Sequence, residues 1–207
     1  MTDMRKTFEE IYARNTWGNG SGEGSHPRHT AGYIAFLQGF LAEHRVRSVV
    51  DFGCGDWQFS QLIDWSGIRY TGFDIVRPVV EENQRRFASD NVGFRLIPDG
   101  GVELPAADLL IVKDVLQHWS DEAVHAFLPT IRRFPLALIT NCANPRGPTV
   151  NRPIGDGGFR CLDLRAAPYH LPAEEVFTFA KQQTFWSRLL PGRNWRKRVL
   201  LVRGGPA

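Results

Sequence analysis

The sequence lacks most of the features that mark an exported, membrane-spanning or metal-binding protein. It has three cysteines, Cys54, Cys142 and Cys161, and their odd number and wide spacing indicate neither a disulfide framework nor a metal site. No apolar run approaches the ~20 residues that a membrane-spanning helix requires. The polar first six residues lack the apolar core of a signal peptide. These absences predict a protein of the reducing cytoplasm with no membrane partner.

Motifs for several reaction classes are absent too. There is no Walker-type phosphate loop and no G-x-S-x-G nucleophile turn. The net charge is only +3, and the excess positive charge gathers late in the chain. Without a recognition motif, this late cluster favours a solvated loop before an edge strand over a nucleic-acid surface. Its members are Arg188, Arg193, Arg196, Lys197, Arg198 and Arg203.

What the chain does contain is an alternation of apolar strand-like runs and helical patterns. Its 207 residues suit a single domain with one sizeable core. Strands that alternate with helices predict a doubly wound α/β domain with a mostly parallel sheet. The expected strands are residues 48–52, 70–73, 92–97, 109–113, 136–140, 176–180 and 198–202, and the expected helices are 7–14, 30–43, 57–65, 77–88 and 121–134.

The most informative segment is the glycine turn that follows the first strand. Gly53 and Gly55 allow a sharp turn and a close approach of the backbone to a ligand. Asp74 ends the next strand, nineteen residues after Gly55, where its carboxylate can accept both hydroxyl groups of a ribose. This arrangement predicts a nucleoside-containing cofactor that lies across the ends of two adjacent strands.

The details of the turn decide between cofactors. A dinucleotide fingerprint requires a third glycine, but here that position is Trp57, so a nicotinamide oxidoreductase is not indicated. Asp51-x-Gly53-x-Gly55 resembles the first motif of class I S-adenosylmethionine (SAM)-dependent methyltransferases. The exit of the fourth strand, with Asp114, Val115 and His118, resembles a later motif of that family. Trp57 is predicted to be either a wall of the pocket or a core residue.

The resemblance implies a fold and a set of cofactor contacts. It implies a Rossmann-like, seven-stranded sheet whose last strand is antiparallel, with residues 1–45 supplying helices and a lid over the cofactor. Asp51 is placed to meet the amino-acid end of SAM, Asp74 the ribose, and Ile75 and Asp99 the adenine. The implied cofactor-binding set is Trp17, Gly22, Ser25, Asp51, Gly53, Cys54, Gly55, Asp74, Ile75, Asp99, Asp114 and Val115.

Methyl transfer to a hydroxyl needs a base near the methyl group. His118 is the predicted base, because an imidazole has a suitable pKa. The alternative is a histidine that packs at a helix start. Asp114, as the carboxylate at the strand end, is predicted to contact the cofactor or to orient the acceptor.

The acceptor is predicted to be a small molecule or a glycan. It should be read by the N-terminal segment, by the substrate-side loop 144–172 and by residues 185–195. Arg160 and Asp163, with Tyr169 for stacking, suit an acceptor rich in hydroxyl groups, although a structural ion pair is the alternative. A non-catalytic binding module, or a methyltransferase that acts on protein or nucleic acid, remains the alternative function.

Overall fold

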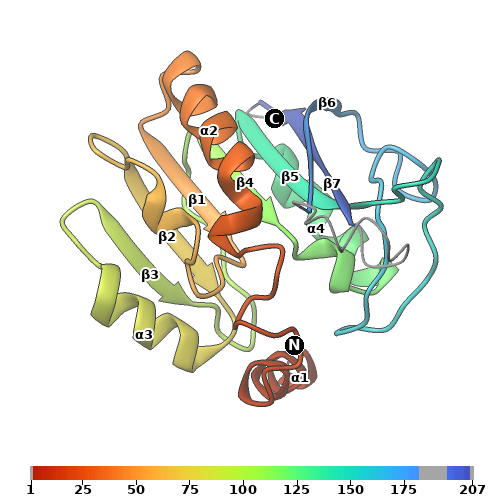
Figure 1. Cartoon of the computed structure of the whole chain (residues 1–207), viewed down its shortest axis with the longest axis horizontal. Helices are drawn as coiled ribbons and strands as arrows, with labels where there is room; N and C mark the ends of the chain where they lie inside the picture. Colours follow the sequence, from red (N-terminus) through yellow and green to blue (C-terminus); the bar gives the residue numbers. More distant parts are fainter. Residues whose placement is uncertain (1, 182–194, 206–207) are drawn as a thin grey trace.

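The computed structural model describes residues 2–181 and 195–205. They form a seven-stranded sheet flanked by helices on both faces (Figure 1). The elements in chain order are α1 (Thr2–Ala13), α2 (Pro27–Glu43), β1 (Ser48–Phe52), η1 (Ser60–Leu62), β2 (Arg69–Asp74), α3 (Arg77–Phe87), β3 (Val92–Leu96), β4 (Leu109–Lys113), η2 (Leu116–His118), α4 (Asp121–Arg132), β5 (Leu136–Ala143), β6 (Glu174–Ala180) and β7 (Arg196–Arg203).

The sheet order is β3-β2-β1-β4-β5-β7-β6. Strands β1 to β5 pair in parallel, and β7 is antiparallel to both of its neighbours, β5 and β6. The predicted seven-stranded Rossmann-like sheet with an antiparallel last strand is therefore confirmed. The chain order reverses at β1 and β4, and ligands of open α/β sheets bind at such a switch point, beyond the carboxyl ends of the strands.

Burial on both faces explains why the central strands are almost wholly apolar. Helices α2 and α3 cover one face, where Tyr33 and Leu37 pack on Val49 and Ile111. Helix α4 covers the other face with Val124, Leu128 and Ile131. Within the described residues, no helix is long and apolar enough to cross a membrane.

The predicted helix at residues 57–65 is wrong. Only the short 3-10 turn Ser60–Leu62 forms there. Trp57 adopts φ 58°, a left-handed conformation that prevents a helix from starting at that residue. Its side chain is 5% exposed and packs among Tyr70, Phe87 and Phe94, so Trp57 is a core residue.

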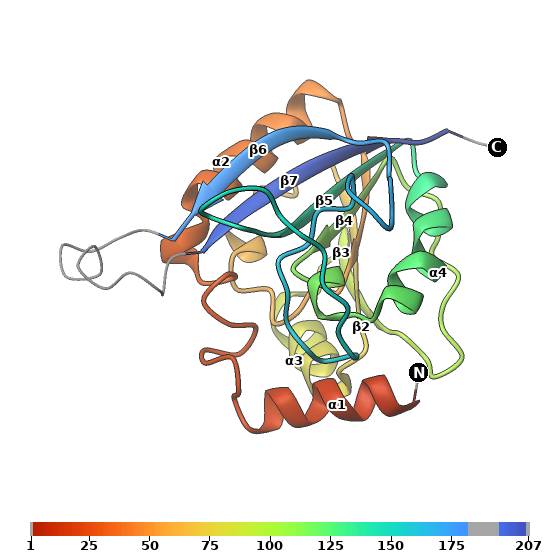
Figure 2. The same cartoon turned by 90° about the vertical axis from the view of Figure 1, so that its right-hand side faces the viewer.

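Helix α1 lies across the carboxyl edge of the sheet rather than on either face (Figure 2). Arg5 of this helix binds the strand ends. Its guanidinium donates to the carbonyl oxygens of Ile75 (3.1 Å) and Ile97 (2.5 Å) and forms an ion pair with Asp99 (2.7 Å). Ile75 follows β2 and Ile97 follows β3. The N-terminal helix is thus held over the strand ends where a cofactor is expected.

Candidate active site

A cavity of about 370 Å³ lies at the carboxyl edge, beneath α1. Its size is within the range of small-molecule sites. Ten of the twelve residues predicted to bind the cofactor line it, together with both predicted catalytic residues. The ten are Trp17, Ser25, Asp51, Gly53, Cys54, Gly55, Asp74, Ile75, Asp114 and Val115; the catalytic two are Asp114 and His118.

The glycine turn after β1 forms one wall of the cavity. Gly53 and Gly55 have φ of 77° and 56°, which residues with a side chain rarely adopt. A Cβ atom at Gly53 would collide with Val115, and one at Gly55 would collide with the Ser21 hydroxyl. Both glycines are therefore required for the turn to pack against its neighbours.

Asp74 joins the end of β2 to this turn. Its Oδ2 accepts the Gly55 N–H and its Oδ1 the Val76 N–H, both at 2.9 Å. Burial raises the pKa of this carboxyl group, while the backbone hydrogen bonds oppose the rise. Each carboxylate oxygen can accept a second hydrogen bond, so Asp74 can also hold ribose hydroxyl groups.

Asp51 lies at the bottom of the same cavity. Its side chain is buried, and its Oδ2 accepts a hydrogen bond of 2.7 Å from the Tyr70 hydroxyl. Burial raises the pKa of Asp51 to about 6, against the opposing effects of Tyr70 and Lys113. At neutral pH this carboxylate is ionised in a poorly solvated site, where a cation is its natural partner.

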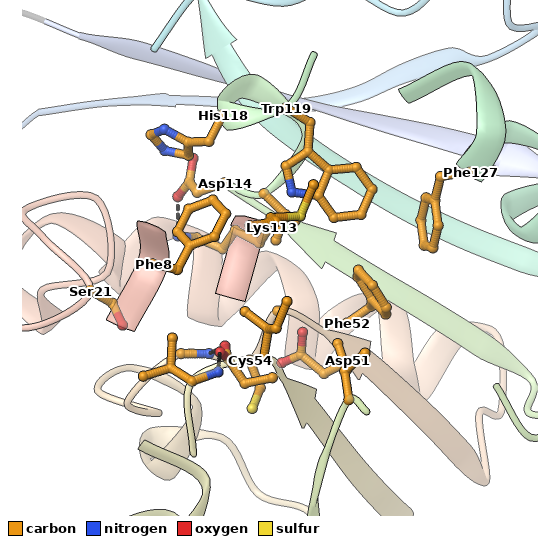
Figure 3. Close-up of a pocket in the computed structure, with 18 of the residues that line it drawn as sticks. Phe8, Ser21, Asp51, Phe52, Cys54, Lys113, Asp114, His118, Trp119 and Phe127 are labelled. Carbon is orange, nitrogen blue, oxygen red and sulfur yellow. Dashed lines mark hydrogen bonds and ion pairs between the residues drawn. The ribbon is translucent and has the colours of Figure 1, made fainter. Parts of the chain in front are cut away.

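Two lysines that the sequence analysis missed surround Asp114. Lys113 ends β4 and its Nζ donates to Asp114 Oδ2 (2.6 Å) and to the Gly24 carbonyl (2.8 Å). Lys197 of β7, expected in a solvated cluster, is buried and also donates to Asp114 Oδ2. Figure 3 shows Lys113 and Asp114 between His118 and Asp51. We call Asp51, Lys113, Asp114 and Lys197 the cavity cluster.

The charges of the cavity cluster are strongly coupled. Burial lowers the pKa of Lys113 to about 8, although Asp114 favours its charged form. Burial would raise the pKa of Asp114, but the two ammonium groups outweigh it and lower that pKa to about 2. Asp114 is therefore a permanent anion and too weak a base to take a proton. Its φ of 62° is unusual for a non-glycine residue and occurs where the chain leaves β4.

His118 lies in η2 at the cavity rim, and its contacts define its tautomer. Its Nδ1 lies 2.7 Å from the Gly158 carbonyl oxygen, which can only accept, so Nδ1 carries the proton. The Gln117 side chain accepts the Cys142 N–H through Oε1, so its amide nitrogen faces His118 Nε2 at 3.3 Å. Burial lowers the pKa of His118, which leaves Nε2 an unprotonated acceptor at neutral pH.

Aromatic side chains from the N-terminal segment complete the cavity. Phe8 and Tyr12 of α1 line it, and the Trp17 ring lies 5.0 Å from the His118 ring. Ser21 ties this segment to the glycine turn, because its hydroxyl accepts the Asp56 N–H (3.0 Å) and bonds to Tyr12 (2.6 Å). The sequence did not indicate Phe8, Tyr12 or Ser21 as site residues, because their role depends on where α1 lies.

Two predicted cofactor residues do not line the cavity. Gly22 has a φ of 83° and packs against Trp17, between the lining residues Ser21 and Ser25. The Asp99 side chain is 58% exposed and pairs with Arg5. Asp99 therefore acts on the site indirectly, by holding α1.

The predicted acceptor residues also lie away from the cavity lining. Arg160 is 5% exposed and donates to Asp121, the Arg152 and Trp119 carbonyl oxygens and the Tyr169 hydroxyl. We call Arg160, Asp121 and Tyr169 the loop cluster. Asp163 pairs separately with Arg165 (3.0 Å) and Arg198 (2.6 Å). These groups hold the substrate-side loop, but Arg160 and Asp163 pair with other residues and do not form the ion pair with each other that the structural alternative expected. Of residues 185–195, only Trp195 lies within the described part of the chain.

Comparisons with known proteins agree with the fold described above. Residues 35–137, about half of the chain, match the O-methyltransferase domain family. The fold is similar to magnesium protoporphyrin IX methyltransferase from Synechocystis PCC 6803 with bound S-adenosylhomocysteine (SAH), with TM-score 0.63, 16% identity and 99% of each chain covered. It is also similar to 1,6-didemethyltoxoflavin-N1-methyltransferase from Burkholderia thailandensis, with TM-score 0.64, 20% identity and 97% and 87% of the two chains covered.

The chain belongs to the class I SAM-dependent methyltransferases. The fold is also similar to human N-acetylserotonin methyltransferase in complex with SAM, with TM-score 0.50 and 18% identity. That match covers 84% of this methyltransferase and 55% of the human chain. No curated protein matches the methyltransferase by sequence. Within the described residues, no group of three or more histidine, cysteine, aspartate or glutamate side chains could hold a metal ion.

Proposed function

We propose that this methyltransferase methylates a hydroxyl group of a small aromatic molecule, with His118 as the base. The observation that supports the proposal is that one cavity is lined both by residues suited to the cofactor and by residues suited to the acceptor. We call these two sets the two half-sites. Asp51, the glycine turn and Asp74 form the first half-site, and Trp17 and His118 form the second. The first suits an adenosyl cofactor, and the second suits a ring with an acidic proton.

The cofactor half-site fits SAM residue by residue. Asp74 can accept the ribose hydroxyl groups, and the apolar Ile75 and Val115 can enclose adenine. The buried, ionised Asp51 offers the negative charge that the amino-acid end requires. SAM supplies a methyl group on a sulfonium, which is already a good electrophile, so the protein mainly has to align the acceptor and exclude water.

The N-terminal segment provides that exclusion in the proposal. Helix α1 and residues 15–26 cover the cavity, and Arg5 and Ser21 attach them to the strand ends and to the glycine turn. Ligand entry then requires this cover to open. Residues 1–45 would thus act as the lid of a single domain.

His118 is suited to remove the acceptor's proton. The Gly158 carbonyl fixes the Nδ1–H tautomer, so Nε2 is the unprotonated nitrogen that can accept a proton. The contact between Gln117 and Nε2 is long, at 3.3 Å, and an acceptor hydroxyl at 2.7–2.8 Å would form a better hydrogen bond. Asp114 would orient the acceptor or the cofactor as a fixed anion, since its low pKa prevents it from serving as the base.

The site favours an aromatic hydroxyl over a sugar. The lining is largely apolar, and the His118 ring has Trp17 at 5.0 Å and Phe159 at 5.7 Å. Phe159 does not line the cavity, but it is 60% exposed beside His118, where a flat ring bound in the cavity can reach it. A phenolic hydroxyl has a pKa of about 10 and yields its proton to imidazole more readily than an aliphatic alcohol does. The glycan hypothesis depended on Arg160, Asp163 and Tyr169, which are occupied elsewhere.

The test has two stages. Calorimetry with SAH should show binding to the wild-type protein and weaker binding to Asp74→Asn. Transfer of labelled methyl groups from SAM to a panel of phenols, matched sugars and primary amines should then yield O-methylated phenols. Absence of SAH binding would favour the non-catalytic module, and transfer to sugars or amines alone would refute the aromatic hydroxyl.

A further inference from the structure

The ends of β1 and β4 present opposite charges side by side. Asp51 pairs with Ile111 in the parallel register, and Lys113 lies two residues further along β4. Side chains two residues apart on a strand share a face, so Asp51 and Lys113 project from the same side of the sheet. Both line the cavity. The site therefore contains an anionic and a cationic group next to each other.

Lys113 is held firmly but retains donor capacity. Two of its three N–H groups are used, one by Gly24 and one by Asp114. Its ammonium also lies 4.9 Å from the Phe59 ring centre, a favourable cation–π contact. The ammonium is thus directed toward the cavity with one N–H left for a ligand.

Lys197 prevents Asp114 from neutralising Lys113 alone. Both ammonium groups donate to Asp114 Oδ2, so one carboxylate is shared between two cations. With Asp51 included, the cavity cluster carries two positive and two negative charges. A ligand with one positive and one negative end adds no net charge, and each of its ends can face the opposite sign.

We infer that Lys113 binds the carboxylate of the cofactor's amino-acid end while Asp51 takes its ammonium. This assignment rests on the proposed function, because it concerns the same cofactor site. Lys197 is then a positioning residue, which acts by sharing Asp114. The cavity cluster would select for a complete amino-acid group, beyond the adenosine that Asp74 and Ile75 recognise.

The experiment varies the ligand and the protein together. Calorimetry measures wild type, Lys113→Met and Asp74→Asn with three probes: SAH, its decarboxylated analogue, and 5′-methylthioadenosine, which lacks the amino-acid group. Wild type should bind SAH about 10- to 100-fold more tightly than the decarboxylated analogue, the range of a hydrogen bond between charged groups. Lys113→Met should bind those two ligands equally and should bind 5′-methylthioadenosine as wild type does.

The control variant separates this role from general damage. Asp74→Asn should weaken all three probes by a similar factor, because each contains the ribose. Equal losses for all three probes in Lys113→Met, or an undiminished preference for SAH, would overturn the assignment. If wild type binds none of the probes, the cofactor site itself fails. If Lys113→Met does not fold, the wild-type comparison of SAH with its decarboxylated analogue still decides whether the carboxylate is recognised.

Discussion

The cavity cluster and the loop cluster are built from the same kinds of side chain but are satisfied differently. In the loop cluster, both terminal nitrogens of Arg160 donate hydrogen bonds to protein acceptors, and the Tyr169 hydroxyl donates to Asp121 at 2.5 Å. In the cavity cluster, Asp114 Oδ1 is buried with no hydrogen-bond partner among the described residues, and Lys113 borders open space. Arg160 Nε in the loop cluster is also buried without a hydrogen-bond partner among the described residues, so the two clusters differ in that only the cavity cluster borders open space.

A buried charge that borders a cavity indicates a binding site, whereas one surrounded by protein partners indicates a structural network. A buried charge that is fully paired within the protein stabilises the loop it holds, and removing one partner is costly. A buried charge that faces a cavity costs folding free energy until a ligand pairs with it. We therefore expect substitutions in the loop cluster to lower stability and substitutions in the cavity cluster to lower binding or rate.

The largest effect should come from His118, which lines the cavity and is hydrogen-bonded to Gly158 of loop 144–172. His118→Ala should lower the methylation rate by ~10²–10⁴, because the base is lost, while SAH affinity stays nearly unchanged. The wild-type rate should rise with pH and level off below the ordinary imidazole pKa of about 6.5, since burial lowers the pKa of His118. Steady-state kinetics against pH would check this. Normal turnover in the variant would show that His118 is not the base and has a structural role through its hydrogen bond to Gly158.

The loop cluster is tested by Arg160→Ala. The change removes four hydrogen bonds and leaves Tyr169 and Asp121 without their cation. We expect the free energy of unfolding to fall by about 2–4 kcal/mol, as for a broken buried pair with one partly exposed partner. Denaturant unfolding measures the loss, and the rate per folded molecule should remain at the wild-type value. A lowered rate without a stability loss would restore Arg160 to the acceptor site.

The cavity cluster should show the opposite response in Asp51→Asn. The folded-state pKa of about 6 exceeds the unfolded value of about 3.9, so ionisation of Asp51 opposes folding. The stability that Asp51 contributes is therefore present below about pH 4 and is lost as pH rises to about 6. Relative to wild type, the variant should gain up to about 3 kcal/mol between pH 4 and 7, while its SAH affinity falls.

Paired unfolding curves at several pH values would measure this gain, and SAH titration would measure the loss of affinity. The Tyr70 hydroxyl can still donate to the amide oxygen, so the comparison isolates the charge. If the variant is less stable than wild type at pH 7, the charge of Asp51 stabilises the fold, and the prediction is wrong.

The smallest effect is expected for Asp74→Asn. The amide keeps one acceptor oxygen, but it loses the charge that strengthens hydrogen bonds to ribose, and its NH2 group cannot accept one of the two bonds that Asp74 receives from the Gly55 and Val76 N–H groups; SAM binding should therefore weaken by about 1.5–3 kcal/mol. Calorimetry gives the change directly, with circular dichroism as the control for an intact fold. Unchanged affinity would exclude Asp74 as the ribose contact.

The sequence predicted a feature correctly where a few adjacent residues specify both its chemistry and its backbone conformation. The glycine turn, Asp74 at the end of β2 and the alternation of strands and helices each depend on short segments, and the sheet has the predicted seven strands with an antiparallel last strand. The helix expected at 57–65 failed because apolar composition does not reveal the left-handed conformation of Trp57.

Long-range placement accounts for the remaining differences. Lys113 and Lys197 are 84 residues apart, and only the insertion of β7 beside β5 brings both to Asp114. A lysine at the end of the apolar run 109–113 was a signal that a buried charge needed a partner. The identity of that partner depended on the sheet.

The glycine turn, the carboxylates at the strand ends and the succession of strands along the chain could be predicted from the sequence, because they follow from local backbone freedom and apolar periodicity. Which charges face the cavity depends on the tertiary fold. Arg160 and Lys113 are both buried cations near carboxylates, and nothing in their neighbours along the chain distinguishes them. The packing of loop 144–172 gives Arg160 four protein acceptors, whereas the ends of β1 and β4 leave Lys113 beside open space. A buried charge becomes available to a ligand where the fold leaves open space beside it.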